Sequence, residues 1–315
     1  MLPSRRLVPA ARSSPIGGSA IYGIPLAMVP NRPSQTAEAV CLMRATDQRR
    51  SPQDRILDDP FARLFLGPMM RAALASWEAS GRLGDLAERL SPGLTTFVLC
   101  RHRYIDDRLV AALRGGAEQV VVLGAGYDSR AWRFAEALAG RPVFELDFPA
   151  TSRRKARIVE RNAKRLPAAE VRFVEIDFQE QSIGERLTQA GYRRGVKTFF
   201  VWEGVAMYLS REAVKAALRA VRELAGAESS LAGDFWYYID EPSLLSTAYR
   251  LSTNFLHFVG EPVTFSIHPE DAGPFLERVG FGLRDLADGS ELERRYVRDG
   301  RRVPPGVYVL HAVAA

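Results

Sequence analysis

Residues 120–132 read VVVLGAGYDSRAW, an apolar run that passes directly into a glycine-rich turn. The apolar run indicates a strand that is buried on both faces, and a helix is expected from about Ser129. Gly124 and Gly126 carry no side chain, so the backbone of the turn can come close to a ligand. A strand, a glycine-rich turn and a helix in this order are typical of α/β folds that bind nucleotides or adenosine-containing cofactors.

The segments that follow continue this alternation, whereas those that precede it are helical. Strands are expected at 119–124, 142–146, 171–176, 198–202, 230–236, 281–286 and 307–313. Helices are expected at 36–50, 61–66, 95–113, 150–165, 182–190, 210–224 and 269–279. Strands that alternate with helices of this length predict a mostly parallel sheet that is covered on both faces.

Two segments depart from this pattern. Residues 1–33 are rich in Arg, Pro, Ser and Gly and contain no acid, which favours a disordered or targeting-like extension, or translation from Met28. Residues 236–266 interrupt the alternation and are expected to form a mostly helical insertion, dense in aromatic residues. The remaining chain, 34–315, is then one domain, in which 34–114 form a helical N-terminal cap.

Composition argues against several classes of protein. No apolar run reaches 18 residues, so no membrane span is expected, and Cys41 and Cys100 form no cluster with histidines that would suggest a metal site. The net charge is +6, but residues 1–50 carry seven arginines and two acids, which leaves the rest nearly neutral. A nucleic-acid-binding body is usually basic. We therefore expect a cytoplasmic protein, monomer or homodimer, that binds a small molecule and neither nucleic acid nor membrane.

Acids at successive strand ends indicate which cofactor the turn binds. The dinucleotide fingerprint requires a third glycine where this chain has Ser129, which disfavours NAD and FAD. Asp147 ends the next strand, 23 residues after Gly124, and is well placed to accept hydrogen bonds from ribose hydroxyls. Asp177 and Glu203 follow the next two strands, at the edge where open α/β sheets bind ligands. S-adenosylmethionine has a ribose and no phosphate, so it suits this pattern better than NAD or FAD does.

The chain resembles the leucine carboxyl methyltransferase family, including its bacterial natural-product branch. The matching stretches are 34–45, 58–65, 101–109, 121–134, 144–155, 177–178 and 202–209. The resemblance implies a Rossmann-like class I methyltransferase fold, with a seven-stranded sheet that is mostly parallel and an antiparallel last strand. It also implies that the N-terminal helices and residues 236–266 form a lid over the methyl acceptor.

The resemblance further implies roles for individual residues. Arg101 would face the methionine carboxylate of S-adenosylmethionine, although Arg103 is an alternative. Gly124 and Gly126 would line the cofactor backbone, Asp147 would hold the ribose, Asp177 and Phe178 the adenine, and Glu203 the methionyl amino end or the pocket floor. Asp128, Arg130 and Arg133 also match; Asp128 can cap the helix after the turn, and the arginines can pair with it or with Glu145.

The residues that meet the acceptor are less defined. Tyr208 either belongs to the core or reaches the acceptor with its hydroxyl. The four histidines form no obvious dyad with an acid, and His257 is the one considered as a base, with packing or surface exposure as the alternative. A carboxylate acceptor is already ionised and needs no base, whereas a phenol or enol does.

The expected function is therefore an S-adenosylmethionine-dependent O-methyltransferase in secondary metabolism, acting on a carboxylate, or on a phenol or enol hydroxyl, of a small molecule. The alternatives are methylation of a protein C-terminal carboxylate and an NAD-dependent oxidoreductase. Methylation of a nucleic-acid base is disfavoured, because the loop after the fourth strand is Glu203-Gly204-Val205 and not the Asn/Asp-Pro-Pro-aromatic loop of such enzymes. A non-catalytic binding protein on the same fold is a further alternative.

Overall fold

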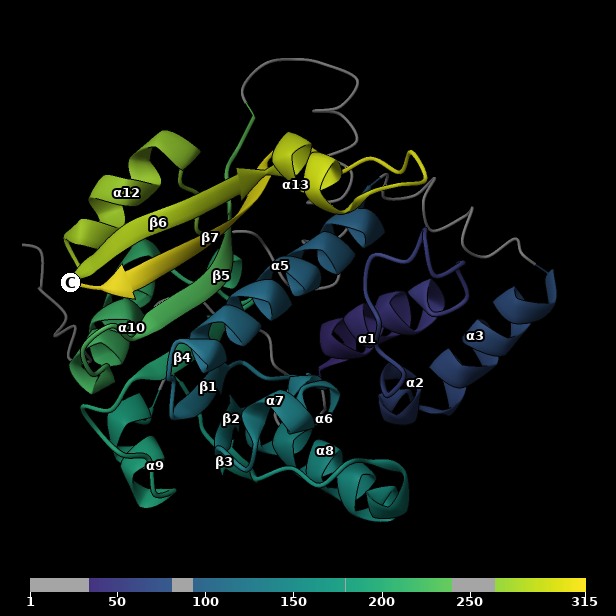
Figure 1. Cartoon of the computed structure of the whole chain (residues 1–315), viewed down its shortest axis with the longest axis horizontal. Helices are drawn as coiled ribbons and strands as arrows, with labels where there is room; N and C mark the ends of the chain where they lie inside the picture. The colour runs from purple at the N-terminus through teal and green to yellow at the C-terminus, as the bar shows by residue number, and fades with distance from the viewer. Residues whose placement is uncertain (1–33, 81–92, 179, 240–263) are drawn as a thin grey trace, which may run out of the picture.

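The computed structural model describes residues 34–80, 93–178, 180–239 and 264–315, and within them seven strands form one sheet (Figure 1). The strands are β1 (Gln119–Leu123), β2 (Val143–Asp147), β3 (Val171–Glu175), β4 (Thr198–Trp202), β5 (Ser230–Trp236), β6 (Phe281–Asp288) and β7 (Val307–Ala314). Their order is β3-β2-β1-β4-β5-β7-β6. The pairs among β1 to β5 are parallel, and β7 is antiparallel to β5 and β6. This confirms the predicted fold class.

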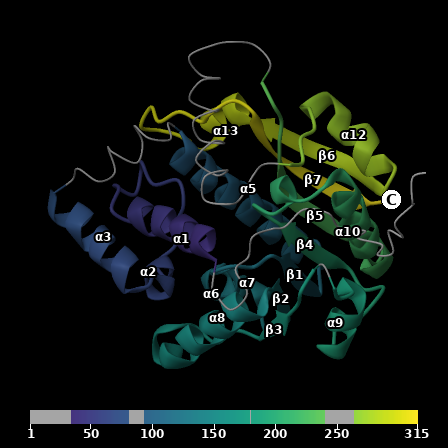
Figure 2. The ribbon, with the colours of Figure 1, turned by 180° about the vertical axis from the view of Figure 1, so that it is seen from behind.

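Helices cover both faces of the sheet because alternate side chains of each central strand point to opposite faces. In β4, Phe199 and Val201 join one apolar cluster, whereas Phe200 and Trp202 join the other. Helices α9 (Ile183–Gln189), α10 (Arg211–Leu224) and α12 (Pro269–Glu277) complete the second cluster. The first contains α5 (Leu94–Arg114), which runs along the sheet (Figure 2).

Short polar side chains accept hydrogen bonds from backbone N–H groups where the first two N-terminal helices begin. Ser34 Oγ accepts a hydrogen bond from the Ala37 N–H, which starts α1 (Gln35–Asp47). Asp59 Oδ1 accepts from the N–H groups of Phe61 and Ala62 and so starts α2 (Ala62–Phe65), which α3 (Pro68–Ser80) follows. Both views place α1 beside α5 and α3 beyond α1, on the side away from β6 (Figure 2).

Short elements complete the chain and position its loops. They are α6 (Arg130–Arg133), α7 (Ala135–Leu138), α8 (Pro149–Arg161), the 3-10 turns η1 (Ala163–Arg165) and η2 (Ala206–Tyr208), and α13 (Gly289–Tyr296). The sequence pattern does not predict the helix at 289–296. Asp288 starts α13 by accepting a hydrogen bond from the Glu291 N–H at 2.9 Å.

Most of the expected insertion, 240–263, lies outside the described residues, as do residues 1–33. His257, the candidate base, is among the residues that are not described. The two described ends of the insertion pack in the body of the protein. Trp236 is the last residue of β5, and the ring of Phe265 lies 5.2 Å from that of Phe235, between their centroids. A covering role over the acceptor therefore stays a prediction for residues 240–263.

Candidate functional site

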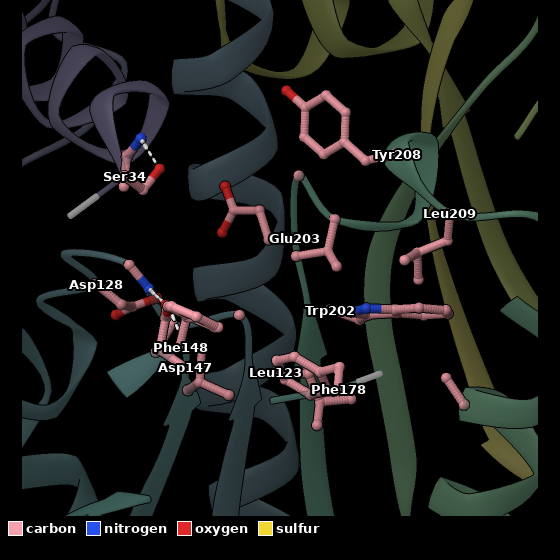
Figure 3. Close-up of a pocket in the computed structure, with 18 of the residues that line it drawn as sticks. Ser34, Leu123, Asp128, Asp147, Phe148, Phe178, Trp202, Glu203, Tyr208 and Leu209 are labelled. Carbon is pink, nitrogen blue, oxygen red and sulfur yellow. Dashed lines mark hydrogen bonds between the residues drawn. The ribbon is translucent and has the colours of Figure 1, made fainter. Parts of the chain in front are cut away.

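A cavity of about 540 Å³ opens at the carboxyl ends of β1, β2, β3 and β4, a size that is usual for small-molecule sites. The sheet topology brings these strand ends to one edge, where the loops after them, α1, α5 and α10 form the walls (Figure 3). The residues named from the sequence that line it are Arg101, Gly124, Gly126, Asp128, Asp147, Asp177, Phe178, Glu203 and Tyr208. The fold thus brings together all the described candidates.

The glycine-rich turn after β1 is shaped by its surroundings as well as by its backbone. Gly124 and Gly126 have φ of +69° and +49°, in the left-handed region that side chains disfavour. A Cβ at Gly124 would lie 2.5 Å from Val205, and a Cβ at Gly126 would lie 3.0 Å from Ala37 on α1. Glycine is therefore required here for close packing against neighbouring elements, and both residues still line the cavity.

Asp147, at the end of β2, supports the turn. One of its carboxylate oxygens accepts a hydrogen bond from the Gly126 N–H, and the other accepts from the Phe148 N–H at 2.6 Å. Burial raises the pKa of Asp147, and these two backbone hydrogen bonds oppose that effect. A carboxylate has about four lone-pair positions, so Asp147 retains capacity to accept further hydrogen bonds from a ligand in the cavity.

The end of β3 provides an aromatic wall. Phe178 is 36% exposed, which is unusual for a phenylalanine, and its ring lines the cavity. The Asp177 N–H donates to Gln181 Oε1 at 2.9 Å, which fixes the loop before α9. Figure 3 shows Phe178 across the cavity from Tyr208. An exposed ring at a cavity wall can stack on a flat ligand such as adenine.

Arg101 points into the cavity from α5, and its charge is balanced there. Its Nε donates to Glu203 Oε1 at 2.8 Å, and its Nη1 lies 3.2 Å from Asp234 Oδ2. Arg103 is the alternative to Arg101. Its side chain is 48% exposed and pairs with Asp107, so it does not face the site. Asp234, on β5, also accepts from the Gly204 N–H at 2.6 Å. Asp234 is not among the residues predicted from the sequence, although it too is an acid near the carboxyl end of a strand.

The expectation that no histidine pairs with an acid is wrong for His102. Its Nδ1 lies 2.6 Å from Glu203 Oε1, because α5 places residue 102 beside the end of β4. Burial lowers the pKa of His102, and Arg130 and Arg44 lower it further, whereas Glu203 opposes them. Burial alone would raise the pKa of Glu203, but His102, Arg130 and Arg101 hold it well below its ordinary value.

A buried network of charges continues from Glu203 below the turn. Arg130 contacts Glu203, Asp128 and Asp106, and Arg133 also pairs with Asp106 at 2.5 Å. Ser129, at the third-glycine position, donates its hydroxyl to Asp59 at 2.7 Å. The predicted pairing of Asp128 with an arginine is confirmed. The alternative that an arginine pairs with Glu145 is wrong, because Glu145 lies 2.5 Å from Lys155, inside the core.

Tyr208 and the remaining features complete the site. Tyr208 is 8% exposed and lines the cavity, with its ring across from Asp147 (Figure 3).

In the described part of the chain, no three His, Cys, Asp or Glu side chains come together as a metal site. Among the described helices, none combines the length and apolar character that a membrane crossing requires.

The family model described as "Leucine carboxyl methyltransferase" matches residues 37–222, which contain every described candidate residue of the cavity. The chain belongs to the leucine carboxyl methyltransferase family. Among the curated members that it resembles, a "Putative S-adenosyl-L-methionine-dependent methyltransferase" of Parafrankia is 36% identical over 199 residues, which are 63% of this chain and 61% of that protein. A protein of the same description from Streptomyces coelicolor is 32% identical over 198 residues, 62% of this chain and 66% of that one. The chain thus spans about two thirds, or slightly less, of these relatives' length.

Solved structures agree on the fold of this leucine carboxyl methyltransferase family member. A methyltransferase structure from Thermobifida fusca, described as putative, covers 92% of this chain and 98% of its own, with a TM-score of 0.57 and 13% identity. A DUF574 family protein from Streptomyces avermitilis covers 80% and 96%, with a TM-score of 0.55 and 15% identity. At these identities the likeness concerns the fold alone.

The residues of the cavity fit the methyl donor that this family implies. Among the described residues, the charged side chains that line the cavity are two arginines and four acids: Arg44 and Arg101, with Asp128, Asp147, Asp177 and Glu203. With His102 neutral, the acids are in excess. Such a site favours the sulfonium and ammonium of S-adenosylmethionine and disfavours a pyrophosphate.

Proposed function

We propose that this protein is an S-adenosylmethionine-dependent O-methyltransferase that acts on a small molecule. One observation carries the proposal: Asp147 supports the glycine turn through the Gly126 N–H and still lines the same cavity as the exposed ring of Phe178. This arrangement provides an acceptor for ribose hydroxyls and a stacking surface for adenine, at the edge where open α/β sheets bind ligands.

When bound, S-adenosylmethionine supplies an activated methyl group on its sulfonium. The contribution of the protein is to align the acceptor oxygen with that methyl and to exclude water. Asp147 and Phe178 would fix the adenosine on the β2 and β3 side of the cavity. Tyr208 lies across the cavity from them, with Glu203 between, and we place the transferred methyl and the acceptor beside these two residues that follow β4 (Figure 3).

The acceptor oxygen is either a carboxylate or a phenol or enol hydroxyl, and a role in secondary metabolism fits the bacterial relatives. The small-molecule partner, a cytoplasmic setting and a monomeric or homodimeric state belong to the same proposal. Methylation of a protein C-terminal carboxylate is the second candidate, because the family is described by a leucine carboxyl activity. An NAD-dependent oxidoreductase is disfavoured by Ser129, whose hydroxyl is bonded to Asp59 where the fingerprint needs glycine.

The test is methyl transfer by the purified chain. We expect acceptors from a panel of small carboxylic acids, phenols and enols to gain the mass of one methyl in the presence of S-adenosylmethionine. A peptide that ends in leucine with a free carboxylate, compared with its C-terminal amide, tests the second candidate. If the purified chain binds S-adenosylmethionine but methylates only the free-carboxylate peptide, the second candidate function replaces the small-molecule assignment.

A further inference from the structure

His102 is held in one orientation by acceptors on one side of its ring. Nδ1 lies 2.6 Å from Glu203 Oε1 and 2.9 Å from the Val98 carbonyl oxygen. Both neighbours accept hydrogen bonds, so Nδ1 carries the proton. In a neutral imidazole the other nitrogen, Nε2, then has the free lone pair. The Glu203 side chain is only 8% exposed, and Arg101 and Arg130 hold it in place.

The other side of the ring is available to a ligand. His102 lines the cavity and is 4% exposed as a residue, and among the described residues no hydrogen bond engages Nε2. Without a hydrogen-bond partner among the described residues, that nitrogen is not fully buried either, and the cavity is the space that His102 lines. His102 thus presents a lone pair to the cavity while Glu203 supports the opposite nitrogen.

This arrangement lies at the acceptor side of the site. Glu203 follows β4, as Tyr208 does, and Figure 3 shows Tyr208 across from Asp147 and Phe178, with Glu203 between them. Since the ribose and adenine are assigned to Asp147 and Phe178, a bound cofactor would extend its sulfonium toward Glu203. His102 contacts Glu203 and lines the same cavity, so it lies on the part of the wall toward which the sulfonium would extend.

We propose that His102, oriented by Glu203, is the general base that takes the proton of a phenol or enol hydroxyl in the acceptor. This inference rests on the proposed methyltransferase function and narrows its substrate class. A carboxylate acceptor is already ionised at neutral pH and needs no general base, whereas a hydroxyl has to lose its proton. A histidine–acid pair beside the cavity therefore favours a hydroxyl acceptor over a carboxylate.

The chemistry balances with these groups. The acceptor oxygen forms a bond to the methyl carbon while the carbon–sulfur bond of the sulfonium breaks, and the sulfur leaves as a neutral thioether. The hydroxyl proton moves to His102 Nε2, and Glu203 stabilises the imidazolium that results. The proton then passes to solvent after the products leave. Arg101, Arg130, Arg44, Asp59 and Glu203 are the charged groups around the ring that set its protonation.

The test compares His102→Gln with the intact chain, and with His268→Gln as a control at an exposed histidine. His102→Asn serves as a second variant if the first does not fold. S-adenosylmethionine affinity is measured by calorimetry, and transfer is measured to a series of phenols, including 4-nitrophenol, and to matched benzoic acids. We expect His102→Gln to keep its cofactor affinity within about threefold and to lower kcat for weakly acidic phenols by about 10²- to 10⁴-fold.

A base acts only on a hydroxyl that is still protonated, so the loss should shrink toward zero for 4-nitrophenol when transfer is assayed at a pH well above neutral, where this phenol is ionised and unactivated phenols are not. The kcat of the intact chain should fall as the pH drops through the lowered pKa of His102. An equal loss for all phenols, unchanged kcat, or a loss of cofactor affinity would overturn the role of His102. So would an intact chain that binds S-adenosylmethionine but methylates only the acids, or neither class. An intact chain that binds no S-adenosylmethionine would instead refute the proposed function.

Discussion

Replacing Asp147 with alanine should weaken S-adenosylmethionine binding by at least about tenfold. Each charge-assisted hydrogen bond from a ribose hydroxyl is worth about 1.5–3 kcal/mol, and about 1.4 kcal/mol corresponds to one factor of ten in affinity. The structure adds a second loss, because Asp147 also accepts from the N–H groups of Gly126 and Phe148. Without it the turn that meets the cofactor loses a buried support, which should lower the free energy of unfolding by about 1–3 kcal/mol.

Calorimetric titration and urea denaturation of the same samples separate these two effects. Asp288→Ala is the matched control, since Asp288 likewise accepts a backbone N–H, at the start of α13 and away from the cavity. We expect the control to lose about 1 kcal/mol of stability, as for other helix caps, and to bind the cofactor as the intact chain does. A folded Asp147→Ala variant with unchanged affinity would refute the assignment of Asp147 to the ribose.

Three further variants test other parts of the account. Phe178→Ala should weaken cofactor binding by about 1–3 kcal/mol because the stacking on adenine is lost. Tyr238→Ala, at another exposed ring, should leave the affinity unchanged. If calorimetry gives both variants the affinity of the intact chain, the assignment of adenine to Phe178 is refuted. Lys155→Met leaves Glu145 buried without its partner and should lower the free energy of unfolding, measured by urea denaturation, by about 3–5 kcal/mol. Adding Glu145→Gln to this variant should restore most of that loss. If the losses of the two single variants simply add in the double variant, the pair is not coupled. Removal of residues 1–27 should leave methyl transfer unchanged, and lost activity in a folded protein would place that segment at the site.

The sequence predicted the sheet and the position of the site because both depend on local patterns. Buried strands show as apolar runs, and a parallel sheet brings their carboxyl ends to one edge. The strand-end positions of Asp147, Asp177 and Glu203 therefore predict a common pocket, and all three residues line it. The glycines of the turn were predicted for close approach to a ligand. Their contacts with Val205 and Ala37 could not be predicted, because those residues are distant in the sequence.

The contacts between helices and strand ends could be predicted less well from the sequence. The His102–Glu203 contact joins residues about a hundred positions apart, and it depends on how α5 rotates against β4. The only sequence signal was that His102 adjoins Arg101 in a stretch already matched to the family. The partners of Arg130 and Arg133 likewise depend on the packing of α6 against α5. Helix α13 was missed because its cap, Asp288, lies at the end of a strand pattern.

The most direct test of the central claim is calorimetric titration of the intact chain with S-adenosylmethionine and, separately, with NAD. The acidic cavity, the support of the Gly126 turn by Asp147 and the serine at position 129 predict binding of S-adenosylmethionine at one site per chain and no measurable binding of NAD. Saturable binding of NAD, with no heat from S-adenosylmethionine, would contradict the account.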